Sequence, residues 1–138
     1  MRVPPAGISA LSAFFAFGSL IACITAIALL VPGGALDPVW RLNPPAHEAL
    51  LSLAPWSVAL MVLVSLACGL ATAGLWRLTR WGYRLALGVL AVNLVGDAGN
   101  AILRGDLHTL IGLPIGAALI AYLRSARVRT YFRLDRPA

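Results

Sequence analysis

Four long apolar runs divide this chain, and they constrain its fold more than any other feature of the sequence. The runs cover about residues 7–31, 55–76, 83–103 and 107–123. At ~1.5 Å per residue, helices of these lengths reach roughly 25–37 Å, which matches a bilayer core of ~30 Å with some tilt or thinning. The first run is too long for the apolar core of a cleavable signal peptide, so we expect it to be retained. The sequence therefore predicts four transmembrane helices.

The charged residues are too few to cover the surface of a soluble domain. Of the 138 residues, 60% are hydrophobic and 12% are charged. Lipid must therefore cover much of the molecule, and a chain of this length makes one domain. We predict an all-α membrane protein, a four-transmembrane-helix antiparallel bundle that comprises residues 1–138.

The positions of the arginines predict the orientation in the membrane. All 11 basic residues are arginines, and with the N-terminus inside only Arg41 and Arg104 lie on the outer side. The other nine would lie inside: Arg2, Arg77, Arg80, Arg84, Arg124, Arg127, Arg129, Arg133 and Arg136. Since cytoplasmic loops carry the excess of basic residues, both termini are predicted to be cytoplasmic.

Seven of the inner arginines are candidates for binding the lipid surface. They are Arg77, Arg80, Arg84, Arg124, Arg127, Arg129 and Arg133. Juxtamembrane arginine clusters bind anionic lipids on the cytoplasmic face, so we expect the bilayer itself as a partner. An acidic cytoplasmic protein is the alternative partner for these clusters. We expect no nucleic acid, because aromatic stacking platforms and a solvated basic face are both missing.

The segment between the first two runs is the only sizeable loop. Asn43 followed by Pro44 and Pro45 is typical of a helix start, with Asn as N-cap and Pro in the first turn. About residues 46–53 are therefore predicted to form a short interfacial helix on the outer surface. The next two links, 77–82 and 104–106, are so short that the helices they join are expected to be antiparallel neighbours.

One face of the third predicted span carries a polar stripe: Asn93, Asp97, Asn100 and Arg104. At 100° per residue these positions fall within about 60° of one another. A carboxylate at such depth costs on the order of 2–3 kcal/mol or more, so Asp97 should face protein or water. Thr25 and His108 are candidate neighbours. The stripe either fixes helix register through hydrogen bonds or lines an outward-facing pocket for a proton, cation or small polar ligand.

Small residues at four-residue spacing recur in three of the predicted spans. They are Gly18, Ala22 and Ala26, then Ser65, Gly69 and Ala73, then Gly112 and Gly116 around Pro114. Small residues let helix backbones approach closely in lipid. Ordinary packing within the chain and a dimer face are both consistent with this pattern.

The sequence predicts no catalytic, metal or cofactor site. Cys23 and Cys68 lie singly within apolar runs, so disulfide exchange has no chemical basis. His47-Glu48 and Asp106-x-His108 lie on the same predicted side of the membrane, but their spacing is not that of a metal motif. No Ser-His-Asp set, phosphate-binding glycine loop or paired carboxylate is recognisable. We therefore expect no cofactor and no metal, and the balance favours a non-enzymatic protein.

Several segments resemble a group of small bacterial four-helix membrane proteins. The segments are LNPPAH (42–47), GLWRLTRWG (74–82), NLVGDAGN (93–100) and IGLPI (111–115). The resemblance covers nearly the whole chain and implies a four-helix fold in a bacterial inner membrane. It implies no activity. Small multidrug exporters fit badly, since they need an acidic residue in the first helix, and quinone-linked disulfide oxidases need cysteine pairs.

The leading functional hypothesis is a non-enzymatic accessory or scaffold subunit of a larger membrane complex, or a self-associating bundle. The short loops leave little room for a soluble catalytic site. The alternative is a transporter or small-ligand-binding protein that uses the stripe around Asp97, and a lipid or quinone enzyme is third.

Overall fold

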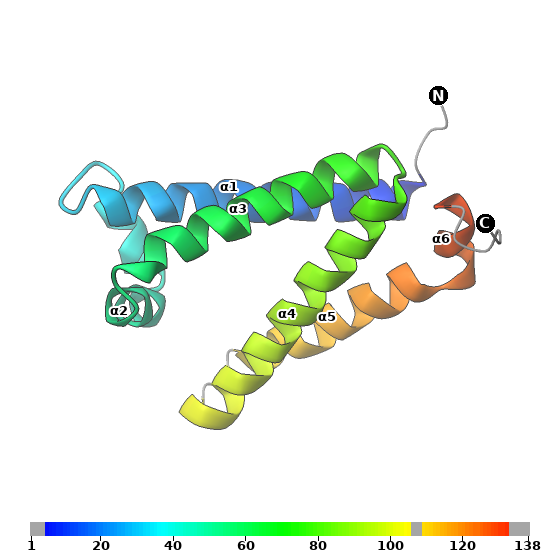
Figure 1. Cartoon of the computed structure of the whole chain (residues 1–138). Helices are drawn as coiled ribbons and strands as arrows, with labels where there is room; N and C mark the ends of the chain where they lie inside the picture. The colour runs from blue at the N-terminus through cyan, green and yellow to red at the C-terminus, as the bar shows by residue number, and fades with distance from the viewer. Residues whose placement is uncertain (1–4, 106–108, 133–138) are drawn as a thin grey trace. The chain divides into compact units, whose positions relative to one another are not determined.

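The computed structural model describes residues 5–105 and 109–132, and every regular element in that part is helical. The elements are α1 (Ala6–Leu30), the 3-10 helix η1 (Asp37–Leu42), α2 (Pro44–Ser52), α3 (Trp56–Trp76), α4 (Arg80–Arg104), α5 (Thr109–Arg124) and α6 (Ala126–Tyr131) (Figure 1). Helices α1, α3 and α4 are long and apolar enough to cross a membrane, whereas α5 has 16 residues. The predicted all-helical fold with apolar membrane-length helices is confirmed.

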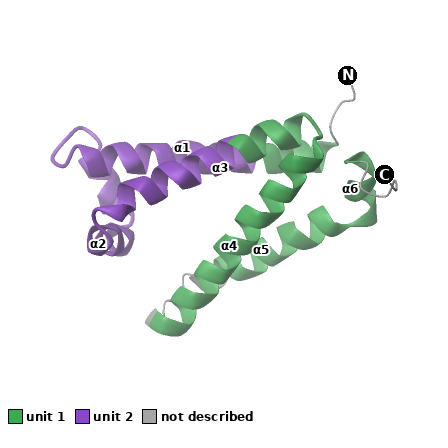
Figure 2. Cartoon of the chain, viewed as in Figure 1, with its two compact units in different colours: residues 1–12, 70–138 green, residues 13–69 purple. Residues whose placement is uncertain are grey.

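The chain divides into two compact units (Figure 2). Unit 1 comprises Met1–Ser12 and Leu70–Ala138, and unit 2 comprises Ala13–Gly69. The division passes through α1 and α3, so each unit contains part of both helices. Each unit has its own packing.

In unit 2, α1 and α3 run antiparallel and meet through small side chains (Figure 1). The Ser19 hydroxyl donates to the backbone oxygen of Ser65 at 2.8 Å, and the Ser65 hydroxyl donates to that of Ser19 at 2.9 Å. A Cβ added at Gly69 would lie 3.3 Å from Ser19 Oγ, and one at Gly18 would lie 3.9 Å from Cys68 Sγ. These small residues therefore pack within the chain.

The loop between α1 and α3 contains two short helices. Pro32 disfavours helical backbone at Val31, and α1 ends at Leu30. Gly33 then takes a positive φ of 76°. The side chain of Asn43 accepts a hydrogen bond from Ala46 N, which confirms the predicted cap, and α2 begins at Pro44. The preceding η1 was not predicted.

The turn between α3 and α4 satisfies the backbone groups of both helix ends. The backbone nitrogens of Leu78 and Thr79 donate to the carbonyls of Leu75 and Gly74, with Leu78 in the left-handed region at φ 53°. The Thr79 hydroxyl then accepts from Gly82 N at 3.2 Å and so caps α4. Helix α4 therefore begins at Arg80, three residues before the predicted start.

The core of unit 1 gathers at the end that contains this turn and the helix α6. Its buried residues include Ile8, Leu11, Ser12, Ala71, Leu75, Tyr83, Ala86, Leu90, Leu123, Val128 and Phe132. Thr72 Oγ1 donates to the Ser12 carbonyl at 3.4 Å, and the Tyr122 hydroxyl lies against Gly7. The first turns of α1 thus pack on the helices at this end of unit 1. The far halves of α4 and α5 instead carry exposed apolar side chains.

Candidate functional site

Helices α4 and α5 form an antiparallel hairpin, and α5 meets the polar stripe through its glycines (Figure 1). A Cβ added at Gly112 would lie 2.6 Å from Asp97 Oδ2, and one at Gly116 would lie 3.2 Å from Leu94 Cδ1. Both glycines therefore face α4. Pro114 lies between them inside α5 and leaves one carbonyl of the preceding turn without its helical N–H partner. The carboxylate of Asp97 therefore lies against the backbone of α5 at Gly112, where no side chain separates the two helices.

The other residues of the stripe lie along the edge of the α4–α5 seam, the contact between these two helices at Gly112 and Gly116. Asp97 is half-buried, whereas Asn93 and Asn100 are exposed. Arg104 is the last residue of α4, and His108 lies outside the described residues. Thr25 is half-buried in unit 2, so its predicted pairing with Asp97 in unit 1 stays a prediction.

Several polar side chains of the long helices have no hydrogen bond within the described residues, and the Asp97 carboxylate is the acidic one among them. In residues 5–105 and 109–132, it takes part in no hydrogen bond and no ion pair. By contrast, the hydroxyls of Ser12, Ser19 and Ser65 all donate to backbone carbonyls. A carboxylate can accept up to about four hydrogen bonds, so the oxygens of Asp97 have capacity for a donor or a cation.

The residues considered as metal ligands do not come together as a metal site in the described part of the chain. The His47 ring stacks on the indole of Trp40, with ring centroids 4.3 Å apart and an interplanar angle of 12°. This stacking joins α2 to η1. Within the described part of the chain, no group of three or more His, Cys, Asp or Glu side chains could hold a metal ion. Asp106 lies outside that part, as does His108.

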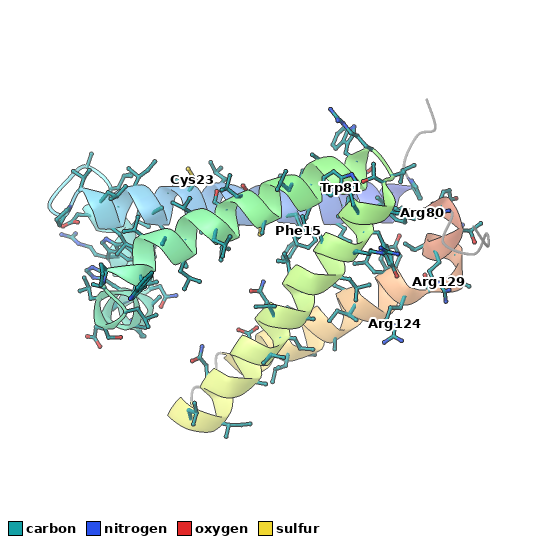
Figure 3. All side chains as sticks on the ribbon, in the orientation of Figure 1. Phe15, Cys23, Arg80, Trp81, Arg124 and Arg129 are labelled. Carbon is teal, nitrogen blue, oxygen red and sulfur yellow. The ribbon has the colours of Figure 1, made fainter. Side chains whose placement is uncertain are left out.

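The candidate lipid-surface arginines lie in unit 1, on segments that meet at its packed end. The six described ones, Arg77, Arg80, Arg84, Arg124, Arg127 and Arg129, are exposed, and Arg133 lies outside the described residues. Figure 3 labels Arg80, Arg124 and Arg129 at this end. The ring of Phe132 lies 5.2 Å from that of Tyr83, which joins the chain after α6 to the first turn of α4.

Sequence reasoning missed α6. With six residues it has no long periodic pattern, and its arginines dominate the composition. The available signal was the pair Val128 and Phe132, apolar residues four positions apart in a basic segment, and both are buried. This spacing puts them on one side of a helix, with the arginines free to face elsewhere.

In comparisons with known proteins, no family model, no curated protein and no solved structure matches this chain.

Proposed function

We propose that this chain is a non-enzymatic integral membrane protein that acts through helix–helix association, as an accessory or scaffold subunit or as a self-associating bundle. In this proposal α5 is a fourth, shorter span, α2 lies in the outer interface, and both termini are cytoplasmic. The membrane is a bacterial inner membrane, as the resemblance to small bacterial four-helix proteins implies.

The observation that carries the proposal is the outer half of α4. Asn93 and Asn100 are exposed there, and on the adjoining side of the helix Val92 is 72% and Leu103 is 86% exposed. In hydrocarbon a side-chain amide without a partner is costly, and amides between helices typically contribute ~0.6 kcal/mol and up to ~1.7 kcal/mol to association. A face that combines two amides with large apolar side chains is suited to bind another helix.

Photo-crosslinking from this face tests the proposal. A photoreactive amino acid replaces Val92 or Leu103 in the full chain, and the matched control replaces Leu63, which is 64% exposed on α3. We expect covalent adducts between position 92 or 103 and a second polypeptide in native membranes, and fewer from position 63. Adducts confined to lipid or to the same chain would contradict an associative role. Native mass spectrometry after gentle extraction then distinguishes a second copy from a larger subunit.

Thiol labelling tests the proposed orientation. Single cysteines replace Glu48 in α2 and Arg127 in α6, after alanine replaces Cys23 and Cys68. A membrane-impermeant maleimide added to intact cells should label position 48 and leave position 127 unlabelled until the membrane is opened. The reverse pattern would overturn the orientation without touching the helical fold.

The second candidate function is binding of a proton, cation or small polar ligand at Asp97. The absence of a hydrogen bond or ion pair on this carboxylate within the described residues favours it. If it is correct, sodium, magnesium or acid should change the melting temperature of the wild-type protein and leave that of Asp97→Asn unchanged. Equal responses of both proteins would remove this candidate.

A further inference from the structure

Two apolar side chains, one helical turn apart, hold the C-terminal helix α6 against the rest of unit 1. Val128 is 2% exposed and Phe132 is 1% exposed. The Phe132 ring packs on Tyr83 at 5.2 Å, and Tyr83 belongs to the first turn of α4. Ser125 is extended (φ −60°, ψ 144°), so the chain changes direction between α5 and α6 (Figure 1). Helix α6 is therefore held near the first turn of α4.

This docking gathers positive charge from segments that are distant in the sequence. Arg77 comes from the α3–α4 turn, Arg84 from α4, and Arg124 and Arg127 from the two sides of Ser125. All four are exposed, and their side chains make no hydrogen bond or ion pair in the part of the chain that the structure describes. Arg80 and Arg129 are each engaged in an interaction of their own.

Little negative charge opposes these arginines. From residue 124 onward the sequence contains five arginines and one acid, Asp135. Asp97 is the only carboxylate among the described residues of unit 1. It is 17 positions along α4 from Arg80, or ~26 Å at 1.5 Å per residue. The packed end of unit 1 is therefore strongly basic.

Exposed aromatic rings occur in the same segments as the arginines. Trp76 and Trp81 flank the α3–α4 turn at 64% and 49% exposure. Tyr122 in α5 and Tyr131 in α6 are 38% and 37% exposed. Trp and Tyr concentrate where a membrane helix passes through the headgroup layer. These rings therefore indicate that the arginines lie at the depth of lipid phosphates, and not further out where a soluble acidic protein would bind.

We propose that the packed end of unit 1 is a binding site for anionic phospholipids, in which Arg124 and Arg127, fixed by the docked α6, bind the headgroup phosphodiester. The guanidinium fork suits phosphate oxygens because it can donate two parallel hydrogen bonds. Arg77 and Arg84 add positive charge at the same end. This inference rests on the membrane placement proposed above. It goes further by naming the class of lipid that binds and the residues that recognise it.

Lipid titration of the purified full chain in detergent tests this site. Native mass spectrometry counts bound phosphatidylglycerol, with phosphatidylcholine as the neutral comparison. Each juxtamembrane arginine contributes about fivefold in affinity, so R124Q/R127Q should weaken phosphatidylglycerol binding by roughly 25-fold. Binding of phosphatidylcholine should not change. The matched control is R41Q, which removes an exposed arginine from η1 and should leave both lipids unaffected.

Two further variants distinguish a structured lipid-binding site from general electrostatic attraction between arginines and anionic lipids. F132A keeps every charge but removes the ring that packs on Tyr83, so it should weaken phosphatidylglycerol binding several-fold. R124K/R127K keeps charge and fold while removing the guanidinium forks, and it should bind more weakly than wild type. The proposed site is wrong if F132A and R124K/R127K both bind phosphatidylglycerol as tightly as the wild-type protein does. It is also wrong if R124Q/R127Q binds this lipid as tightly as the wild-type protein does. Protein partners appear in the same spectra, so failure of the lipid site is distinguishable from failure of the proposed associative function.

Discussion

Ser19 of α1 and Ser65 of α3 each donate a hydrogen bond to the backbone carbonyl oxygen of the other, at 2.8 and 2.9 Å. The two hydroxyl oxygens lie 3.4 Å apart. Such a reciprocal pair needs close backbones, and Gly69 permits this because it has no Cβ near Ser19. The pair satisfies both hydroxyls inside a helix interface where water is scarce, so unit 2 contains a polar clasp between its two long helices.

Removing either hydroxyl should therefore loosen unit 2. Ser65→Ala is expected to lower the free energy of unfolding by ~0.6 kcal/mol, and by no more than ~1.7 kcal/mol, the range measured for hydrogen bonds between membrane helices. Thermal unfolding in detergent, followed by circular dichroism, measures the change. Ser9→Ala is the control, since the Ser9 hydroxyl makes no hydrogen bond within the described residues. An equal loss in both variants would contradict the clasp.

The contact between Gly74 and Gly82 makes a second prediction. A Cβ added at either glycine would overlap the backbone of the other, and neither main chain can move without opening the α3–α4 turn. We expect Gly82→Ala to destabilise the protein by about 1–3 kcal/mol, the usual cost of overpacking. Gly88→Ala in the same helix is the matched control, because nothing lies within 4 Å of its added Cβ. Both variants are compared by their melting temperatures, and similar values would refute the close approach.

The hydroxyl of Thr79 links the two helices at this turn. It accepts from Gly82 N at 3.2 Å and donates to the Gly74 carbonyl at 3.0 Å. Thr79→Val keeps the shape and removes both bonds, so we expect a loss of about 1 kcal/mol, typical of an N-cap. Thr79→Ser should retain most of the stability. Chemical unfolding of the three proteins gives the comparison, and equal stability of the Val and wild-type proteins would exclude the capping role.

The sequence contained enough information to predict the long helices and some of their ends. Apolar runs predict α1 and α3 because lipid rewards continuous apolar surface, and Asn43 predicts the start of α2 because its side chain suits an N-cap. Thr79 is an equally good cap, yet the charged and aromatic residues after it obscured the start of α4. Helix periodicity could not predict η1 or α6, because each has only six residues.

The candidate sites depend on contacts between helices, which a single sequence does not contain. Periodicity placed Asp97 on the same face as Asn93 and Asn100, and that face follows from helix geometry alone. The contact of Asp97 with Gly112 depends on how α4 and α5 align across their short link. Likewise, the arginines were recognisable as clusters, but the docking of Phe132 on Tyr83 is a tertiary contact.

The contact between Asp97 and Gly112 supports a test that separates packing from simple loss of a charge. A Cβ at position 112 would lie 2.6 Å from Asp97 Oδ2, so Gly112→Ala should displace the carboxylate and destabilise the α4–α5 hairpin. When Asp97 is also replaced by alanine, the added methyl group finds space, and the second substitution should cost much less. For residues in contact, such non-additivity amounts to about 0.5–3 kcal/mol.

A double-mutant cycle of Gly112→Ala and Asp97→Ala, measured by unfolding in detergent, gives this coupling energy directly. Gly99→Ala combined with Asp97→Ala is the control cycle, because a Cβ at Gly99 meets nothing within 4 Å and the two effects should add. Strong coupling only in the first cycle would establish that the carboxylate rests on the α5 backbone. Additive effects in both cycles would mean that Asp97 points away from α5, and the seam would then have no polar contact at this depth.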